Sequence, residues 1–257
     1  PPPKDFAKYA THLAAAAYCP AADLIGWNGT CTQCKNVPGF QTAGVAQDDP
    51  TGTQAFVGFD PAANEVVVSF RGSADFIDWI EDFETWKVDA DFDGCSGCKV
   101  HAGFYEAHNS IKATVLKFVQ SEVAAHPGAS VLVTGHSLGA SMAVLSVAEL
   151  AANAKINVTH CYTMGQPRVG DKAFHDWYDG IIMPDNHFRL VHHHDIVPTL
   201  PPQFFGFEHT HTEIWYDEAS SSYVICDGSG EDPKCSDSNI DLSADDHTYY
   251  LNITMGC

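Results

Sequence analysis

The stretch Val131-Leu132-Val133-Thr134-Gly135-His136-Ser137-Leu138-Gly139-Ala140 decides how this chain is expected to fold. Its opening residues are apolar and mostly β-branched, which is typical of a buried parallel strand. Residues 141–154 are rich in Ala, Leu and Val and favour a helix. Gly-x-Ser-x-Gly lies between the two. The pattern therefore predicts a strand, a sharp turn that carries Ser137, and a helix.

The two glycines of this turn have a steric reason, because a Cβ at Gly135 or Gly139 would collide with the neighbouring strand or helix. Strand, sharp turn and helix form the nucleophile elbow of the α/β-hydrolase fold. The helix that begins beneath Ser137 directs its N–H groups and dipole toward it and favours negative charge there. We predict one α/β-hydrolase-type domain over residues 1–257, with a mostly parallel central sheet flanked by helices. A chance match in a loop is the alternative.

Composition limits the partners that this chain can have. It has 257 residues, of which 45% are hydrophobic, enough for one large core. Thirteen basic residues against 33 acidic ones give a net charge of −20, which argues against nucleic acid and anionic membranes as partners. No apolar stretch is long enough for a transmembrane segment. We expect a soluble, mature monomer that meets neutral or zwitterionic substrates.

Nine cysteines indicate an oxidising compartment, so we expect a secreted, extracellular protein. Two local pairs suggest disulfides, and a zinc ribbon is the alternative. Strands and a helix are expected between those pairs, which makes zinc the weaker interpretation. The candidate disulfide cysteines are Cys31 with Cys34, Cys95 with Cys98, Cys226 with Cys235 and Cys19 with Cys257, which leaves Cys161 as a buried free thiol. If the protein is secreted, the sequence offers three glycosylation acceptors, at Asn28, Asn157 and Asn252.

The segment after the first predicted hairpin combines a candidate oxyanion site with a candidate lid. Residues 53–59 and 65–70 predict a β-hairpin, whose second strand delivers Ser73 to the sheet edge where open α/β sheets bind ligands. In residues 75–86, apolar side chains fall on one helical arc and acidic ones on the opposite side. We predict a lid over about residues 74–86 that opens at an oil surface. A helix docked permanently on the core is the alternative. The predicted lid and substrate-binding residues are Phe76, Ile77, Trp79, Ile80 and Phe83.

Serine is a weak nucleophile that needs a histidine base, and the histidine needs a carboxylate to set its tautomer. In α/β-hydrolases the order along the chain is serine, acid, histidine. Asp195 follows a predicted strand and begins a Pro-bounded loop, and His247 lies on a C-terminal loop suited to reach Ser137. The sequence predicts the triad Ser137, Asp195 and His247. The lower-ranked alternatives are His209 and His211 as the base and Asp171, Asp176, Asp179 and Asp185 as the acid.

Five motifs carry a resemblance to a known family. They are VTGHSLGA around Ser137, FRGS ending at Ser73, YTMGQPRVGDKAF, HDIVPTLPP and DDHTYYL. In order and spacing they resemble the fungal class 3 triacylglycerol lipases over nearly the whole chain. The resemblance implies the same triad, and an oxyanion hole from the N–H and hydroxyl of Ser73 and the N–H of Leu138. It also implies pairing of Cys19 with Cys257.

Two sets of residues also allow a metal interpretation. His192 and His194 share a strand face near His209 and His211, and imidazoles are good zinc ligands. The acidic run 89–94 suits calcium but lacks a full EF-hand pattern. We interpret both sets as structural and expect no metal and no cofactor.

The function that we expect is a secreted lipase that hydrolyses acylglycerol esters at an oil–water interface. It would work through an acyl-enzyme intermediate and lid-controlled interfacial activation. A carboxylesterase of the same fold, acting on feruloyl esters or partial glycerides, is the alternative. A non-catalytic binding protein on the same scaffold is a remote third possibility. Such a protein should have lost a triad or oxyanion residue, and this sequence has lost none.

Overall fold

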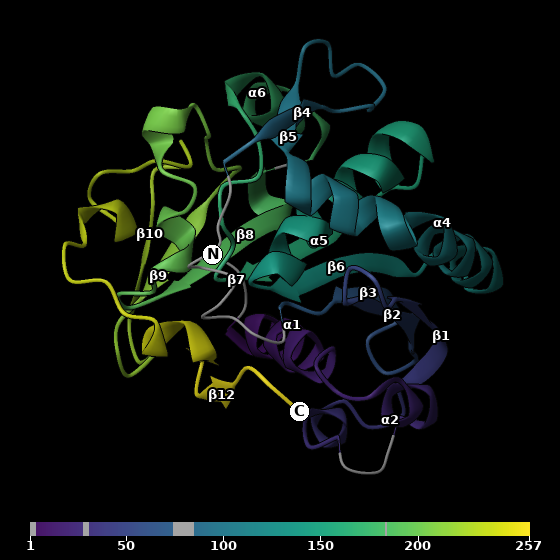
Figure 1. Ribbon diagram of the computed structural model, residues 1–257. Helices are drawn as coiled ribbons and strands as arrows, with labels where there is room; N and C mark the ends of the chain where they lie inside the picture. Colours follow the sequence, from purple (N-terminus) through teal and green to yellow (C-terminus); the bar gives the residue numbers. More distant parts are fainter. Residues whose placement is uncertain (1–3, 28–30, 74–84, 183) are drawn as a thin grey trace.

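The computed structural model describes residues 4–27, 31–73, 85–182 and 184–257. Its centre is an eight-stranded sheet with the strand order β1-β2-β3-β6-β7-β8-β9-β10 (Figure 1). The strands from β3 to β9 run parallel, while β1, β2 and β10 are antiparallel to their neighbours. The bounds are β1 Gln41–Asp48, β2 Thr53–Asp60, β3 Glu65–Phe70, β6 Ser130–His136, β7 His160–Met164, β8 His187–His192, β9 Glu213–Tyr216 and β10 Tyr223–Ile225.

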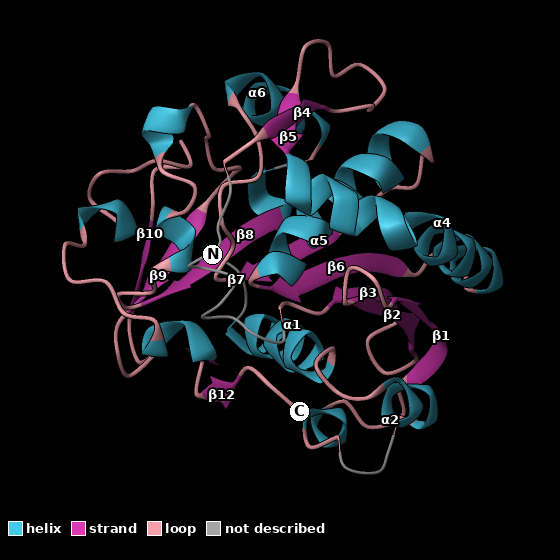
Figure 2. Ribbon diagram, in the orientation of Figure 1, coloured by secondary structure: helices cyan, strands magenta, loops and turns pink. Residues whose placement is uncertain are grey.

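Helices cover both faces of this sheet (Figure 2). Helices α1 (Lys4–Ala16) and α2 (Ala21–Gly26) lie on one face, and α4 (Ala102–Ala125), α5 (Leu138–Ala148) and α6 (Lys172–Ile181) lie on the other. A π-helical turn, Glu149–Asn153, follows α5. Two short ribbons stand apart from the sheet, β4–β5 (Lys87–Asp89, Lys99–His101) and β11–β12 (Tyr249–Tyr250, Ile253–Thr254). The 3₁₀ turns are Gln33–Asn36, Pro184–Asn186, Val197–Thr199, Gln203–Phe205, Ser236–Ser238 and Asp245–Thr248.

The central strands are buried on both sides, which explains their unbroken apolar sequences. In β3, Val66 and Val68 face the core beneath α4 and α5, while Val67 faces the core beneath α1. Strand β6 alternates in the same way, with Val131 and Val133 on one side and Leu132 on the other. Successive side chains of a strand point to opposite faces. One apolar run can therefore serve both cores and hold Ser137 at the strand end.

The elbow strand β6 and the hairpin β2–β3 lie where the sequence predicts them. At one edge of the sheet, β1 forms from small and polar residues that make no apolar run, and of these Ala46 alone is buried. At the other edge, β9 runs parallel to β8, and β10 pairs antiparallel with β9. The elbow helix was expected to reach residue 154, but its α-helical part ends at Ala148. The predicted lid residues Phe76, Ile77, Trp79, Ile80 and Phe83 lie outside the described residues.

Disulfide bonds join the cysteine pairs that the sequence suggests. Cys19–Cys257, Cys31–Cys34, Cys95–Cys98 and Cys226–Cys235 are bonded, and Cys161 is a buried free thiol. The first of these ties the loop after α1 to the last residue of the chain. Among the described helices, none combines the length and apolar character that crossing a bilayer requires.

Candidate active site

The turn that carries Ser137 joins β6 to α5 at the carboxyl edge of the sheet. Ser137 has φ 60° and ψ −130°, a conformation that a residue with a side chain adopts only when its surroundings enforce it. Those surroundings are backbone atoms. A Cβ on Gly135 would overlap the carbonyl oxygen of Gly139, and one on Gly139 would overlap that of Phe70. The close approach of α5 to β3 and β6 therefore requires both glycines.

Asp195 and His247 form a buried pair beside this turn. The Nδ1 atom of His247 lies 2.8 Å and 3.0 Å from the two carboxylate oxygens of Asp195, and both side chains are almost fully buried. The Val197 N–H donates to Asp195 Oδ1 at 2.8 Å, and the Tyr250 hydroxyl donates to Oδ2. Because Nδ1 donates to the carboxylate, the neutral imidazole keeps its proton there and leaves Nε2 as the basic nitrogen.

The backbone at residues 164–165 connects this pair to the serine turn. The Ser137 N–H donates to the Met164 carbonyl at 3.0 Å. Gly165 follows with φ 57°, and a Cβ there would lie 2.6 Å from the His247 ring and 2.9 Å from Asp195 Oδ2. The side chains of Ser137, Asp195 and His247 therefore pack around one strand end. The hydroxyl of Ser137 is buried and makes no hydrogen bond to any group within the described part of the chain.

A tyrosine and a second histidine, which sequence reasoning missed, support His247. His136 Nε2 lies 2.8 Å from the His247 carbonyl oxygen, and His136 Nδ1 lies 2.7 Å from the Tyr18 hydroxyl. A carbonyl only accepts, so Nε2 carries the proton and Nδ1 accepts from Tyr18. Burial holds the pKa of His136 well below its usual range, and the nearby His247 adds to the effect. His136 is therefore neutral and places no positive charge beside His247.

The candidate oxyanion residues lie on the two segments that flank the serine. Ser73 is half-buried and follows Gly72 at the end of β3, and Leu138 is the first residue of α5. A Cβ on Gly72 would lie 2.7 Å from the His136 carbonyl and 3.0 Å from the Ser137 Cβ. Gly72 therefore lets the β3 end press against the serine turn. This arrangement suits N–H donors converging on a developing negative charge.

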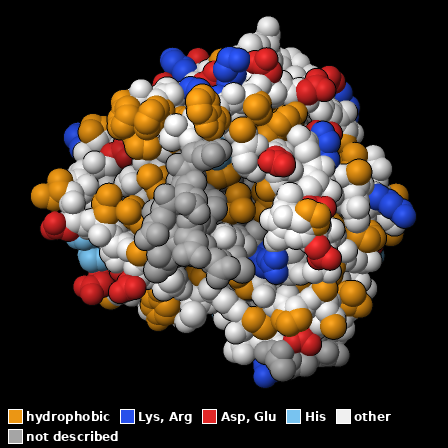
Figure 3. Space-filling model, viewed as in Figure 1, with side chains coloured by type: hydrophobic (Ala, Val, Ile, Leu, Met, Phe, Trp, Pro, Cys, Tyr) orange, Lys and Arg blue, Asp and Glu red, His pale blue; other side chains and the backbone are white. Residues whose placement is uncertain are grey.

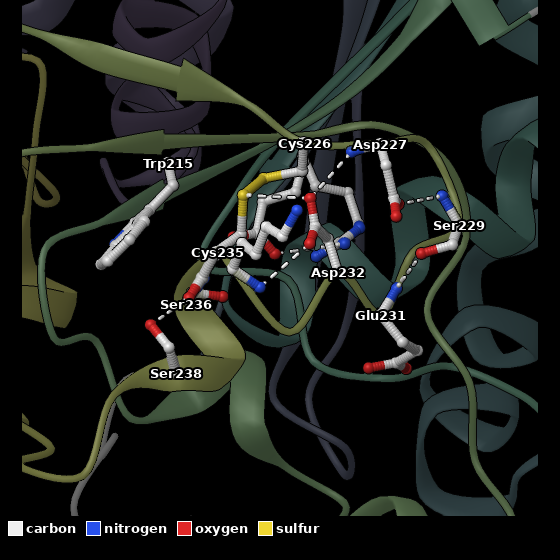
Figure 4. The surroundings of a disulfide bond; sticks show 12 residues. Trp215, Cys226, Asp227, Ser229, Glu231, Asp232, Cys235, Ser236 and Ser238 are labelled. Carbon is white, nitrogen blue, oxygen red and sulfur yellow. Dashed lines mark hydrogen bonds and ion pairs between the residues drawn. A yellow bond between two sulfur atoms is a disulfide. The ribbon is translucent and has the colours of Figure 1, made fainter.

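A disulfide-closed loop supports the segment that follows Asp195. Cys226–Cys235 closes the loop that carries Glu231, whose N–H donates to the Ser229 hydroxyl oxygen at 3.2 Å (Figure 4). The Glu231 carboxylate receives two hydrogen bonds of 2.8 Å from the buried Arg168 guanidinium. Arg168 in turn donates to the carbonyls of Thr199 and Pro201, at 2.8 and 3.2 Å. Arg168 thereby ties the disulfide-closed loop to the segment that follows Asp195.

The residues that the sequence offers as an alternative base or as metal ligands have other partners. His209 Nε2 contacts the Pro198 carbonyl and His211 Nε2 contacts that of Ile182, so neither ring reaches Asp195 in the way that His247 does. In the run 89–94, Asp89 pairs with Lys99 and Asp93 with Lys155. Within the described residues, the group of potential metal ligands that converges is Glu213 with Cys226 and Cys235, whose sulfurs are joined to each other. Of the glycosylation candidates, Asn157 and Asn252 are exposed, and Asn28 lies outside the described residues.

A mostly parallel sheet flanked by helices, with a serine elbow after a central strand and an Asp–His pair on later loops, defines the α/β-hydrolase class. Within that class, the chain belongs to the class 3 lipase family. The model of that family, described as lipase (class 3), matches residues 67–205.

Relatives and solved structures agree with this assignment. The chain is 32% identical over 258 residues to a lipase of Rhizopus niveus, an alignment that covers 98% of this chain and 64% of the relative. It is also 32% identical to the secreted mono- and diacylglycerol lipase 1 of Fusarium solani, with 98% and 77% covered. A triacylglycerol lipase whose catalytic centre is described as a serine protease triad superposes with a TM-score of 0.90 at 31% identity, covering 98% of this chain and 95% of that one. The chain thus spans 64% of the length of the Rhizopus relative.

Proposed function

We propose that this protein is a lipase that hydrolyses acylglycerol esters through a covalent acyl-enzyme. Ser137 Oγ attacks the ester carbonyl while His247 Nε2 takes its proton, and Asp195 holds the imidazole and balances its positive charge. The tetrahedral intermediate collapses and expels the alcohol, which receives the proton from His247. Water then attacks the acyl-enzyme by the same route and releases the fatty acid.

The observation that carries this proposal is the buried Asp195–His247 pair packed against the strained turn of Ser137. The hydrogen bond of 2.8 Å fixes the imidazole tautomer that a base requires. Oxyanion stabilisation is assigned to the N–H and hydroxyl of Ser73 and the N–H of Leu138. The position of Leu138 at the start of α5 supports this, because helix N-termini favour negative charge.

Lipid substrates are favoured by the surface around the triad. Four large apolar side chains are exposed on the loops that leave Asp195 and approach His247, and hydrophobic side chains gather at the upper left of the view in Figure 3. Phe204 and Leu242 line one cavity of about 680 Å³, and Lys87 Nζ donates to the Phe205 carbonyl at 2.9 Å. Trp86, beside Lys87, is 71% exposed. A neutral oil surface can cover these groups without meeting repulsion from the net charge of −20. The four loop residues are Phe204, Phe205, Ile240 and Leu242.

The remaining features of the proposal follow from this substrate. Four disulfides and a relative named as secreted support an extracellular location. The continuous central sheet supports one domain over residues 1–257. We propose that this domain acts as a monomer. We also assign the lid to about residues 74–86, with Phe76, Ile77, Trp79, Ile80 and Phe83 as its lipid-facing side chains. Because Ser73 borders this segment, lid opening and formation of the oxyanion hole would be coupled.

The test measures hydrolysis below and above the solubility limit of a triacylglycerol such as tributyrin. The wild type should show activity that rises steeply once droplets form, and Ser137→Ala should lose several orders of magnitude on both forms while keeping its melting temperature. A serine-directed phosphonate should label Ser137 alone. Near-wild-type activity of Ser137→Ala would refute the mechanism. Activity that saturates below the solubility limit would instead identify a soluble-ester esterase.

A further inference from the structure

Asp246 connects the loop of the acid to the loop of the base. It immediately precedes His247, and its carbonyl and carboxylate oxygens both face the run of histidines that immediately precedes Asp195. The contacts are Asp246 O with His192 Nδ1 at 2.9 Å, Oδ2 with His193 Nδ1 at 2.9 Å, and Oδ2 with the His194 N–H at 3.1 Å. One residue thus binds three consecutive positions of the opposite loop.

Backbone hydrogen bonds extend this connection toward Ser243. The Ser243 N–H donates to the His194 carbonyl at 2.8 Å, and the Ile196 N–H donates to the Ser243 carbonyl at 3.2 Å. The Ser243 hydroxyl accepts from the Asp246 N–H at 3.1 Å. The two loops therefore meet as a short ladder, with the carboxylate of Asp246 at one end.

His193 is held in a conformation that aims its ring at Asp246. Its φ of 43° lies in the left-handed region, which residues other than Gly, Asn and Asp seldom adopt. The His193 N–H donates to the Tyr216 carbonyl at 2.9 Å. The His193 carbonyl accepts from Trp215 Nε1 at 2.7 Å and from Asn239 Nδ2 at 2.8 Å. Such strain persists only where the surroundings over-determine it, and it concentrates at functional sites.

Two further acidic residues and a second histidine lie near His193. Asp217 and Glu218 line a cavity beside it; the Asp217 carboxylate accepts hydrogen bonds from Ser221 and Ser222, and the Glu218 carbonyl lies 3.0 Å from His192 Nε2. The ring of His194 stacks on that of His193, with centroids 3.9 Å apart and planes 8° from parallel. The carboxylate within hydrogen-bond distance of the His193 ring is therefore that of Asp246.

We propose that His193 and Asp246 form a clasp that positions the acid and base loops relative to each other, an inference that rests on the proposed function. Neither residue is catalytic. They hold the Asp195 carboxylate and the His247 imidazole in the geometry that turnover requires. Their side chains are 30% and 19% exposed. A pair that is this accessible to solvent contributes little to the free energy of unfolding. Misplacing a catalytic group by 1 Å, however, can cost about 100-fold in rate. The clasp should therefore affect kcat more than stability.

The chain offers a matched control for this clasp. His126 and Glu122 form a second partly exposed pair, 3.5 Å apart, with side chains 30% and 16% exposed. It lies at the end of α4, remote from Ser137. Glu122→Ala therefore makes a comparable change at a pair of similar exposure that touches neither catalytic loop.

The experiment measures kcat and KM on soluble p-nitrophenyl butyrate, together with the melting temperature. Asp246→Ala should lower kcat about 10-fold and change KM less than about twofold, because orientation rather than substrate binding is altered. His193→Asn keeps a residue that tolerates the left-handed region and should lower kcat about fivefold. The double variant should be no slower than Asp246→Ala, since both changes open one clasp. If Asp246→Ala does not fold, Asp246→Asn should still lower kcat about threefold.

A proton NMR measurement completes the test without substrate. The Nδ1 proton that His247 shares with Asp195 should shift or broaden in Asp246→Ala and stay unchanged in Glu122→Ala. Wild-type kcat and an unchanged resonance in Asp246→Ala would overturn the clasp, and so would a change confined to KM or to the melting temperature. A wild type without Ser137-dependent hydrolysis would refute the proposed function instead, and the resonance would still report on the clasp.

Discussion

The two ends of the central sheet each hold a buried carboxylate beside a histidine. At the carboxyl end, Asp195 lies 2.8 Å from His247. At the amino end, Glu65 at the start of β3 lies 3.0 Å from His160 at the start of β7. In each pair the Nδ1 atom of a histidine lies within hydrogen-bond distance of a carboxylate oxygen. An acid–histidine pair is therefore not by itself a sign of an active site.

The surroundings of each carboxylate make the difference. Asp195 receives donors from Tyr250 and Val197 in addition to His247. Glu65 Oε2 has no hydrogen-bond partner among the described residues, and burial raises the pKa of Glu65 against the opposing influence of His160. Strand β6 also continues into the Ser137 turn only at the carboxyl end. The proposed catalytic pair, Asp195 with His247, therefore differs from Glu65 with His160 in two ways. Both oxygens of its carboxylate accept hydrogen bonds, and the candidate nucleophile Ser137 lies beside it.

Removing the histidine at each end should give the largest contrast. His247→Ala removes the proposed base and should lower kcat by about 10⁴–10⁶-fold, whereas His160→Ala should leave kcat within about twofold of wild type. Steady-state kinetics on p-nitrophenyl butyrate compare the two. A similar loss of kcat in both variants would mean that the amino-end pair takes part in turnover.

Neutralising the carboxylates while keeping their shape should sharpen the contrast. Asp195→Asn presents an amide that can impose the wrong tautomer on His247, and kcat should fall about 10⁴-fold. Glu65→Gln should leave kcat within about twofold. The same assay measures both, with circular dichroism to verify the fold. An Asp195→Asn loss below about tenfold would indicate that another acid orients the base.

The oxyanion segment should show an intermediate effect. Ser73→Ala removes a hydroxyl donor but keeps the N–H, so the loss in kcat should lie near the lower end of about 10²–10³-fold. Ser73→Thr keeps the hydroxyl and should retain much of the activity. Equal rates for the alanine and threonine variants would show that the hydroxyl is not a donor.

The smallest effect concerns stability at the amino end. Because the pKa of Glu65 is raised in the folded state, its contribution is fully present below the unfolded pKa and is lost as pH rises through the folded value. Glu65→Gln has no ionisable group at this position, so its stability does not fall with pH for this reason. Its melting temperature should therefore gain on that of the wild type as pH rises from 4 to 7. A constant difference across that range would contradict the raised pKa.

Local sequence was sufficient for the elements whose causes are local. The apolar run of β6, the steric demand at Gly135 and Gly139, and the hairpin β2–β3 could each be read from neighbouring residues. Asp195 and His247 could also be proposed, because the chain order of an α/β-hydrolase triad limits the candidates. Strand β1 could not be predicted in this way, because a partly exposed edge strand needs no apolar pattern. The direction of β9 depends on its pairing with β8, which neighbouring residues do not reveal.

The sequence by itself determined the elbow, the central strands and the candidate nucleophile, because backbone sterics and hydrophobic periodicity act over a few residues. The roles of the histidines were decided only by the tertiary structure. His136 meets Tyr18 across 118 positions, and His247 meets Asp195 across 52. His193 is aimed at Asp246 by partners on two other segments, β9 and the loop at Asn239. Whether an imidazole is a base, a support or a counterion depends on the atoms opposite its two nitrogens, and long-range packing of the loops places those atoms there.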